Sequence, residues 1–336
     1  MPAIAFDTEA EWHSIRERHV GGSEIACLFY EWRLPDGSTA VHHLFEPLPD
    51  DGTLLGCCSP FKTGYRLWLE KAGRLMPDDL DEVERIQAGN FLEPAIAEWA
   101  KTKFDWSKLR KVRRYLTHEA IPGWGSSLDY EVNEAGRPPV ELKNVDGGKF
   151  RREWTCDGKD IVGLPLQYAL QVQSQIGVAA ADHGWIVACI GGNELRRGRI
   201  ERHQPTQERI AEAVTAFWLG VANGLEPEHY ADFETVAQVH REGVKVDDPV
   251  EIDAPNFDLH CRRYLRWKKH ADFVDTYVSN IKGRLALHVG EATKVRSVGH
   301  RITWPAVFRA AKQIPARWQD ESSYRGAFLV TPIKED

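Results

Sequence analysis

The segment GSSLDYEVNEAGRPPVELKN, residues 125–144, decides the fold. Polar and apolar residues alternate in SSLDYEV and again in PVELKN, and the turn-rich NEAGRPP separates the two runs, which is the pattern of two neighbouring strands. Ser127 and Asp129 are two residues apart, so we expect them to share one face of a strand. Glu141 and Lys143 share a face of the next strand in the same way. Pairing of the two strands would bring two carboxylates and an ammonium group together.

Further elements are predicted on both sides of this segment. VRRYLT, residues 112–117, precedes it as a third strand and completes a meander. Apolar residues at helical spacing predict helices at about 59–73, 80–103, 165–178 and 206–222. The apolar run GWIVACIGG predicts a buried strand at about 184–192, and RRGRIER a more exposed one at about 196–202. Pro94 predicts a kink or two abutting helices in the second of these helices. The order predicts an α/β fold with a mixed sheet flanked by helices.

The pattern loosens beyond about residue 228. A charged helix is expected over 258–286, a hairpin within 290–304 and a terminal strand near 326–330. No stretch rich in Gly, Ser or Pro separates this part from the rest. We therefore expect a core over 1–227 and a helical and hairpin extension over 228–336 that packs on it.

The composition is that of a globular, soluble protein. Of the 336 residues, 42% are hydrophobic and 28% are charged, and the mean hydropathy is −0.44. No apolar run approaches the roughly 18 residues of a membrane span, and the first residues lack the pattern of a signal peptide. Six cysteines without a CxxC pair favour reduced thiols over a zinc or iron–sulfur site. We expect a cytoplasmic protein that does not engage a membrane.

The net charge of −7 argues against a nucleic-acid partner, but local charge differs from the average. The run at 101–114 contains seven cations and one acidic residue, and the run at 262–269 interleaves five cations with Tyr264 and Trp267. Cations with aromatic side chains suit a phosphate backbone. A solvated helix face or strand edge would give the same pattern.

The chemistry centres on the paired strands. Two carboxylates close together repel unless a cation joins them, and hard oxygen ligands suit Mg²⁺ or Mn²⁺. A lysine beside such an ion can assist a water that attacks a phosphodiester. Glu93 on a preceding helix offers a third carboxylate, and Tyr168 and Gln171 share a face of the following helix. An alternating charged strand can also be a plain solvated face.

Six motifs in a fixed order carry a family resemblance: RERHVGGSEIA, SPFKTGYRLWLEKAG, GNFLEP, GSSLDYEV, VELKN and YALQVQSQIGV. With them the chain resembles the YqaJ-type viral recombinase nucleases, relatives of phage lambda exonuclease in the PD-(D/E)xK superfamily, over about residues 12–220. The resemblance implies a restriction-endonuclease-like core within the α/β fold.

The resemblance also implies roles for individual residues. Asp129 and Glu141 would be direct metal ligands, joined by the carbonyl of Leu142. Lys143 would position or activate the attacking water. Glu93 would hold a second metal ion or its waters, so that each site takes two Mg²⁺ ions, with Mn²⁺ as the alternative. Gln171 would lie next to the reacting phosphate.

Three further residues match positions that cradle a terminal 5′-phosphate in the lambda-type enzymes: Arg16, Ser23 and Ser127. Guanidinium and hydroxyl donors suit a dianionic phosphate monoester. Arg18 competes with Arg16 for this role, because the two residues are only two apart. Ser23 can instead be the N-cap of a helix.

The segment 32–56 is a long, acidic insertion between the motifs, and it could form a flap over a DNA channel. His42 and His43 within it are expected to be loop residues rather than metal ligands, because no carboxylate pattern surrounds them. Trp32 or Phe45 could wedge into a duplex end, although an aromatic side chain in a loop usually packs.

The leading functional hypothesis is a Mg²⁺-dependent exonuclease that degrades one strand of linear double-stranded DNA from its 5′ end. Its 3′ single strands would serve recombination together with a single-strand annealing protein. The resemblance implies a homo-oligomer, in the form of a ring-shaped trimer, in the cytoplasm of a bacterial or phage-infected cell. The alternatives are an endonuclease or nickase in defence or repair, a DNA-end-binding protein that does not cleave, and a protein-interaction scaffold.

Overall fold

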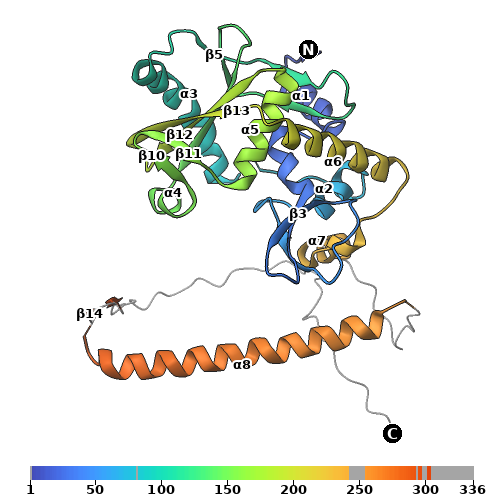
Figure 1. Cartoon of the computed structure of the whole chain (residues 1–336), viewed down its shortest axis with the longest axis vertical. Coiled ribbons are helices and arrows are strands. Elements are labelled where there is room, and N and C mark those ends of the chain that lie inside the picture. The colour runs from blue at the N-terminus through green and yellow to red at the C-terminus, as the bar shows by residue number, and fades with distance from the viewer. Residues whose placement is uncertain (1, 81, 242–253, 293, 297–300, 304–336) are drawn as a thin grey trace, which may run out of the picture. The chain divides into compact units, whose positions relative to one another are not determined.

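The computed structural model describes residues 2–80, 82–241, 254–292, 294–296 and 301–303 (Figure 1). The chain divides into two units, Met1–Val239 and His240–Asp336. In the described residues no helix has the length and apolar character needed to cross a membrane. All six cysteines are free thiols, as expected.

A seven-stranded sheet forms the centre of the first unit. Its strands, in spatial order, are β10 (Thr155–Asp157), β11 (Asp160–Gly163), β13 (Glu194–Glu201), β12 (His183–Ile190), β9 (Pro139–Val145), β8 (Tyr130–Val132) and β5 (Leu109–Lys111). β9 and β12 run parallel, whereas β12 and β13 are antiparallel. The predicted mixed sheet is therefore confirmed.

Helix α3 (Glu84–Phe104) covers one face of this sheet. Its Ile96, Ala97 and Ala100 pack against alternate residues of β9 and β12, among them Val140 and Val187. Pro94 lies inside the helix, yet the structure assigns one helix throughout. The expectation of two abutting helices was wrong: the packing of its carboxyl-terminal half on the sheet stabilises the helix beyond the one hydrogen bond that proline removes.

The opposite face is covered by α4 (Gly147–Glu153) and α5 (Leu166–Ala179) (Figure 1). Val172 and Ile176 of α5 pack there against Ile186 and Ala188 of β12. Ile186 pairs in register with Glu141 of β9, so this second face also carries the polar residues of β9. The helices on both faces confirm the predicted layers.

Two three-stranded sheets lie beside the central sheet. One has the order β1 (Ala3–Ala5), β6 (Arg114–Thr117) and β7 (Gly125–Ser127), and the other the order β3 (Thr39–His43), β2 (Phe29–Arg33) and β4 (Thr53–Cys57). The predicted meander was wrong in one respect. β6 and β7 pair with β1 in a sheet of their own, and the chain, which leaves the central sheet after β5, returns to it at β8.

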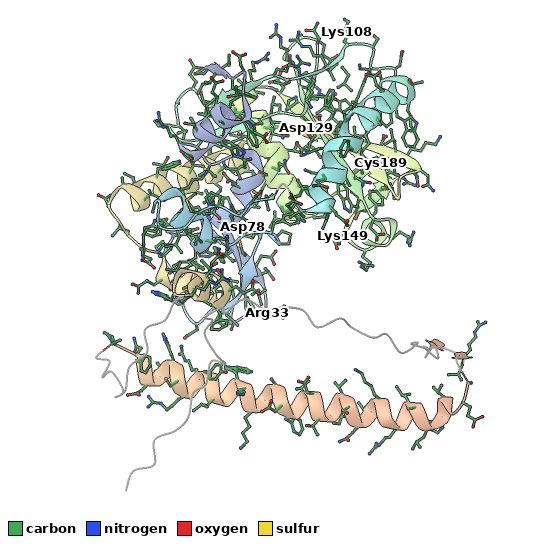
Figure 2. The ribbon with its side chains drawn as sticks, turned by 180° about the vertical axis from the view of Figure 1, so that it is seen from behind. Arg33, Asp78, Lys108, Asp129, Lys149 and Cys189 are labelled. Carbon is green, nitrogen blue, oxygen red and sulfur yellow. The ribbon has the colours of Figure 1, made fainter. Side chains whose placement is uncertain are left out.

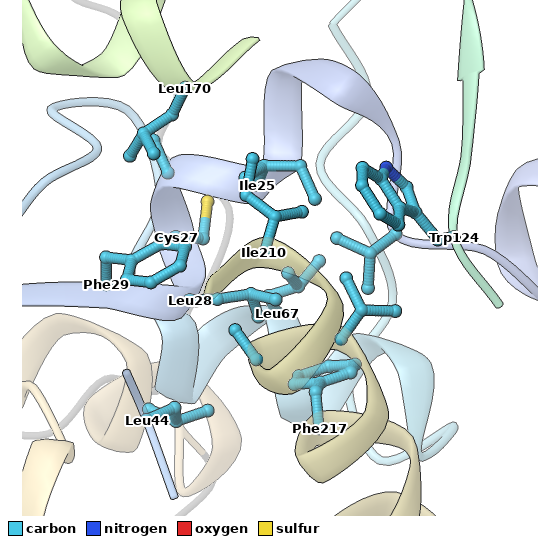
Figure 3. Packing of buried hydrophobic residues seen from close by; sticks show 14 of the residues in the cluster. Ile25, Cys27, Leu28, Phe29, Leu44, Leu67, Trp124, Leu170, Ile210 and Phe217 are labelled. Carbon is cyan, nitrogen blue, oxygen red and sulfur yellow. The ribbon is translucent and has the colours of Figure 1, made fainter. Parts of the chain in front are cut away.

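The amino-terminal part contributes α1 (Glu9–Glu17), the 3-10 helix η1 (Gly22–Leu28) and α2 (Gly64–Lys71). Helices η1, α2 and α6 (Gln204–Ala222) share a hydrophobic core, to which they contribute residues such as Leu28, Leu67 and Phe217 (Figure 3). The predicted start of α2 at Ser59 is corrected. Thr63 is the N-cap, while Ser59 accepts hydrogen bonds from two backbone amides in the turn before it.

The insertion at 32–56 is not an open loop. Trp32 is 4% exposed in β2 and its ring stacks on His229 at 5.6 Å between centroids. Phe45 packs against Gly220 of α6, where an added Cβ would lie 2.4 Å from its ring. Both aromatic side chains therefore pack in the fold, and the expectation of a flap is corrected to a small sheet.

The first unit extends through η2 (Glu228–Tyr230) and α7 (Phe233–Val239), since Tyr230 contacts Tyr30 at 4.0 Å between ring centroids. The second unit contains α8 (Phe257–Val289) and a hairpin of β14 (Lys294–Arg296) and β15 (Arg301–Thr303). This helix and hairpin were predicted. The strand expected near 326–330 lies outside the described residues.

Candidate active site

The polar residues of β9 gather on the sheet face that α5 covers. Glu141 is 2% exposed, and the ammonium group of Lys143 donates a hydrogen bond to its Oε1. Strand alternation places both side chains on one face, as predicted from their spacing. A carboxylate and its ammonium partner are thus held at the middle of the sheet.

Asp129 lies in the link between β7 and β8 rather than within a strand. Its Oδ2 accepts a hydrogen bond of 3.1 Å from the amide of Leu142, and this contact ties the link to β9. Ser127 ends β7, in the other sheet, so the expectation that Ser127 and Asp129 share a face of one strand was wrong. The chain changes sheet between the two residues.

Helix α5 supplies the groups that hold Glu141 in place. Gln171 Nε2 donates to Oε1 at 2.7 Å, and Gln175 Nε2 donates to Oε2 at 2.5 Å. Tyr168 lies one turn before Gln171, with its ring centroid 5.2 Å from Lys143 Nζ. The structure thus brings the predicted Gln171 next to Glu141, and it adds Gln175, which the sequence analysis missed although a spacing of four residues from Gln171 marks the same helix face.

The charges of this cluster perturb one another. Burial, and then the nearby carboxylate of Glu141, raise the pKa of Asp129 well above its usual value. Burial alone would lower the pKa of Lys143, but Glu141 and Asp129 outweigh it, so that this pKa is raised. Two buried carboxylates that disfavour each other's charge create a place where a divalent cation would be stabilised.

The donor set fits a hard cation in part. Asp129 and Glu141 offer carboxylate oxygens, which Mg²⁺ and Mn²⁺ prefer. Glu93 of α3 is near enough to raise the pKa of Asp129, but its Oε1 pairs with Lys111 Nζ at 2.9 Å. Across the described part of the chain, no three His, Cys, Asp or Glu residues are grouped closely enough to hold a metal ion. The structure therefore assembles two of the three predicted carboxylates.

Two of the residues expected at a 5′-phosphate are connected through Trp12. The guanidinium of Arg16 lies over the ring of Trp12, 4.5 Å from its centroid. The indole nitrogen of Trp12 donates to Ser127 Oγ at 2.7 Å. Arg16 is half-buried, whereas Arg18, the competing cation, is exposed. The contacts favour Arg16 as the residue that lies beside Ser127.

The ion pair of Glu24 and Lys71 contacts Arg16. Glu24 lies 3.6 Å from Arg16 and 3.2 Å from Lys71, and it also accepts the amide of Gly21 at 2.9 Å. Lys71 Nζ donates to the carbonyl of Arg16 at 2.8 Å, and its side chain is 7% exposed. Sequence reasoning missed Glu24 and Lys71, because residues so far apart in sequence give no common pattern.

Ser23 lies in the first turn of η1, and its side chain is exposed. The cap position of that helix belongs to Gly21, so Ser23 is not the N-cap that the sequence offered as an alternative. The adjacent Gly22 leaves no room for a side chain, since an added Cβ would lie 2.6 Å from Ser126 Oγ. This close approach brings η1 against β7, and so places Ser23 near the strand that ends at Ser127.

The basic run at 101–114 is largely paired within the fold. Arg110 Nε and Arg114 Nη2 donate to Glu131, at 2.7 and 2.9 Å, and that carboxylate is 2% exposed. Lys111 pairs with Glu93, and Lys101 with Glu98 at 2.6 Å. The alternative of a structural role therefore holds for these four cations.

The part of the chain that holds the carboxylate cluster is similar to a known protein family. Residues 50–182 match the model of the YqaJ-like viral recombinase domain. The matched segment covers less than half of the chain. It contains α2 to α5 together with Glu93, Asp129, Glu141, Lys143 and Gln171, whereas Arg16 and Ser23 precede it. The resemblance drawn from the sequence motifs is confirmed over this segment.

Two solved structures are similar to the chain. An alkaline exonuclease from Laribacter hongkongensis shares 18% identity, with a TM-score of 0.45, over 66% of this chain and 95% of its own. A phage-related exonuclease from Haemophilus somnus 129PT shares 13% identity, with a TM-score of 0.43, over 62% of this chain and 95% of its own. No curated protein matches the chain.

Proposed function

We propose that this protein is a metal-dependent exonuclease that degrades one strand of linear double-stranded DNA from its 5′ end and leaves 3′ single strands for recombination. The observation that carries the proposal is the cluster of Asp129, Glu141 and Lys143 within the matched segment. Burial and the nearby carboxylate of Glu141 raise the pKa of Asp129, so the ionised Asp129 is held at a cost that a cation would relieve. The two carboxylates suit a site for phosphodiester hydrolysis.

Asp129, Glu141 and the carbonyl of Leu142 would hold a Mg²⁺ or Mn²⁺ ion. That ion would supply Lewis-acid activation of the attacking water and would neutralise charge on the phosphate. Glu93 would serve a second ion or its waters. Because Glu93 now pairs with Lys111, this role requires it to release that partner.

The protein groups around the carboxylates orient the reactants. Lys143 can give a hydrogen bond to the attacking water, because its ammonium group has three donors and Glu141 accepts one of them. Gln171 and Gln175 keep the carboxylate of Glu141 in one orientation, because each donates to a different oxygen. Gln171 would contact the reacting phosphate as well.

Arg16, Ser23 and Ser127 would bind the terminal 5′-phosphate, which carries two charges where an internal diester carries one. The guanidinium of Arg16, fixed between Glu24 and Trp12, loses little side-chain entropy on binding. Recognition of a terminal phosphate would direct the cluster to DNA ends.

The resemblance to the YqaJ-type nucleases supports a proposal for the partners. We propose that the protein acts on double-stranded DNA ends in the cytoplasm with a single-strand annealing protein, and that it assembles as a ring-shaped trimer around its substrate. An exonuclease stays on its strand more readily in a closed channel than in an open cleft.

The test is digestion of three DNAs in Mg²⁺: a linear duplex with 5′-phosphates, the same duplex with 5′-hydroxyls, and a covalently closed circle. We expect degradation of the phosphorylated duplex, with chelator as the control that stops it. Cutting of the circle would instead make the protein an endonuclease or nickase. Binding without cleavage of any of the three would make it a DNA-end-binding protein and would reject the proposal.

A further inference from the structure

A cavity of about 590 Å³ lies at the end of β9, beside the carboxylate cluster. Its walls come from α3, the start of α4, α5 and the turn after β12. They are formed by Arg85, Leu92, Asn144, Val145, Asp146, Lys149, Arg152, Tyr168, Gly191 and Gly192. The volume is in the range of cavities that hold small ligands. None of the roles assigned above uses it.

The cavity is basic. Arg85, Lys149 and Arg152 line it against one acidic residue, Asp146. The carboxylate of Asp146 already has a partner within the fold, because Asp146 is the N-cap of α4 and its Oδ1 accepts a hydrogen bond of 2.8 Å from the backbone amide of Lys149. Glu153, outside the lining, lies 3.8 Å from Lys149. The balance of charge favours an anionic ligand such as a phosphodiester. Lys149 is labelled in Figure 2.

Two other walls suit a nucleobase and a backbone. Leu92 is 40% exposed, and Tyr168 offers an aromatic ring, so together they provide apolar surface for a base. Gly191 and Gly192 have φ of +57° and +77°, and this turn leaves main-chain groups without covering side chains. The cavity therefore offers cations to a phosphate, apolar surface to a base and main-chain groups to the sugar–phosphate backbone.

The ring of Tyr168 joins the cavity to the catalytic cluster. It lines the cavity and also lies 5.2 Å from Lys143 Nζ. Further along α5, Gln175 contacts Glu141, and its Cγ would lie 3.6 Å from a Cβ on Gly22, beside the phosphate-binding residues. The helix thus runs from the cavity, past the carboxylates, to the 5′-phosphate site, over about 10 Å.

We propose that the cavity binds the nucleotide immediately 3′ of the bond that is cut, on the strand being degraded. This inference rests on the proposed function. With the 5′-phosphate at Arg16 and the scissile phosphate at Glu141, the strand continues toward Tyr168. Arg152 and Arg85 would hold its next phosphate, while Leu92 and Tyr168 would contact its base.

The test compares Arg152→Ala with Arg151→Ala in the full-length protein. Both residues lie on α4 and both variants lose one positive charge, but only Arg152 lines the cavity. On a 5′-phosphorylated linear duplex we expect Arg152→Ala to raise KM about tenfold with kcat within about twofold, since contact to a phosphate that does not react binds ground and transition states alike. Arg151→Ala should match wild type, and Arg152→Lys should recover part of the loss.

A second measurement probes the base. Replacing the second nucleotide of the degraded strand by an abasic residue should raise KM for wild type. The same replacement should raise the KM of Leu92→Ala by a smaller factor, because that variant has already lost the contact between Leu92 and the base. Equal KM for Arg152→Ala and Arg151→Ala, in an enzyme that cleaves, would overturn the inference and leave the proposed function intact. A wild-type protein that cleaves none of these DNAs would reject both.

Discussion

Trp12 and Ser127, 115 residues apart, are joined by a hydrogen bond of 2.7 Å from the indole nitrogen to the hydroxyl oxygen. This bond fixes α1 to the end of β7, and Arg16 lies over the same indole ring. The bond also relates α1 to the proposed metal-binding carboxylates, since Asp129 is only two residues beyond Ser127. One aromatic side chain therefore relates the position of Arg16 to the position of a proposed metal ligand.

Arg16→Ala should erase the preference for a 5′-phosphorylated end without stopping cleavage. Loss of a charged donor to a phosphate typically costs about 1.5 to 3 kcal/mol, so the ratio of kcat/KM for phosphorylated and hydroxyl ends should fall by about tenfold or more. The matched control is Arg18→Ala, which removes an exposed cation from the same segment. A preference that survives in Arg16→Ala and disappears in Arg18→Ala would assign the phosphate to Arg18.

Lys143→Ala should abolish cleavage while DNA binding persists. Glu141 keeps the amide donors of Gln171 and Gln175, and Asp129 keeps the amide of Leu142, so the cluster stays ordered without the ammonium group. We expect kcat to fall by about 10² to 10⁴, as for loss of a group that acts on the transition state. Binding to a 5′-phosphorylated duplex, measured by fluorescence anisotropy in Ca²⁺, should stay within about twofold of wild type. Turnover at the wild-type rate would reject the site.

Asp129→Asn should lose both cleavage and the stabilisation that Mg²⁺ gives. In chelator, however, the variant should be as stable as wild type or more stable by about 1 kcal/mol, because it removes a buried charge that Glu141 opposes. The amide oxygen of Asn can still accept from Leu142. Thermal unfolding with and without Mg²⁺ checks both parts. A large loss of stability in chelator would show that the carboxylate is needed for folding.

Glu24→Gln tests the ion pair behind Arg16 through its pH dependence. Burial would raise the pKa of Glu24, but Lys71 and Arg16 outweigh it and lower the pKa below the usual 4.5. The ionised carboxylate therefore stabilises the fold at pH above about 4.5, and this contribution is lost as pH falls through the lowered value. Chemical denaturation should show wild type more stable than Glu24→Gln at pH 7 and the two converging in acid. A difference that does not change with pH would contradict this.

The sequence predicted the parts of the site that depend on local spacing. Glu141 and Lys143 share a face because strand residues alternate, and Gln171 reaches Glu141 because α5 crosses that face. It did not predict where Asp129 lies, since alternation continues through SSLDYEV while the backbone leaves one sheet and enters another. β6 and β7 join one sheet by pairing with β1, whereas β8 joins the other by pairing with β9. These partners are distant in sequence, and the residues of a short strand do not identify them.

The remaining differences have a similar cause. Pro94 suggested a break by local rules, and packing of α3 on the sheet overrode it. The ion pair of Glu24 and Lys71 forms only after η1 and α2 meet in the core, so neither residue stood out beforehand. Whether a charged residue is buried depends on the tertiary structure. A buried ion pair can be predicted from the sequence only where both of its residues lie in one helix or strand.

Helix α5 carries Tyr168, Gln171 and Gln175 on one rigid rod, and this limits how the chain can change during evolution. Deleting one residue between Tyr168 and Gln175 would rotate everything that follows by about 100° and shift it by about 1.5 Å. Gln175 would then leave Glu141, while Tyr168 stayed beside Lys143. We expect related sequences to exchange side chains along α5 yet to keep its residue count between these positions, and to accept insertions and deletions only in the loops around it.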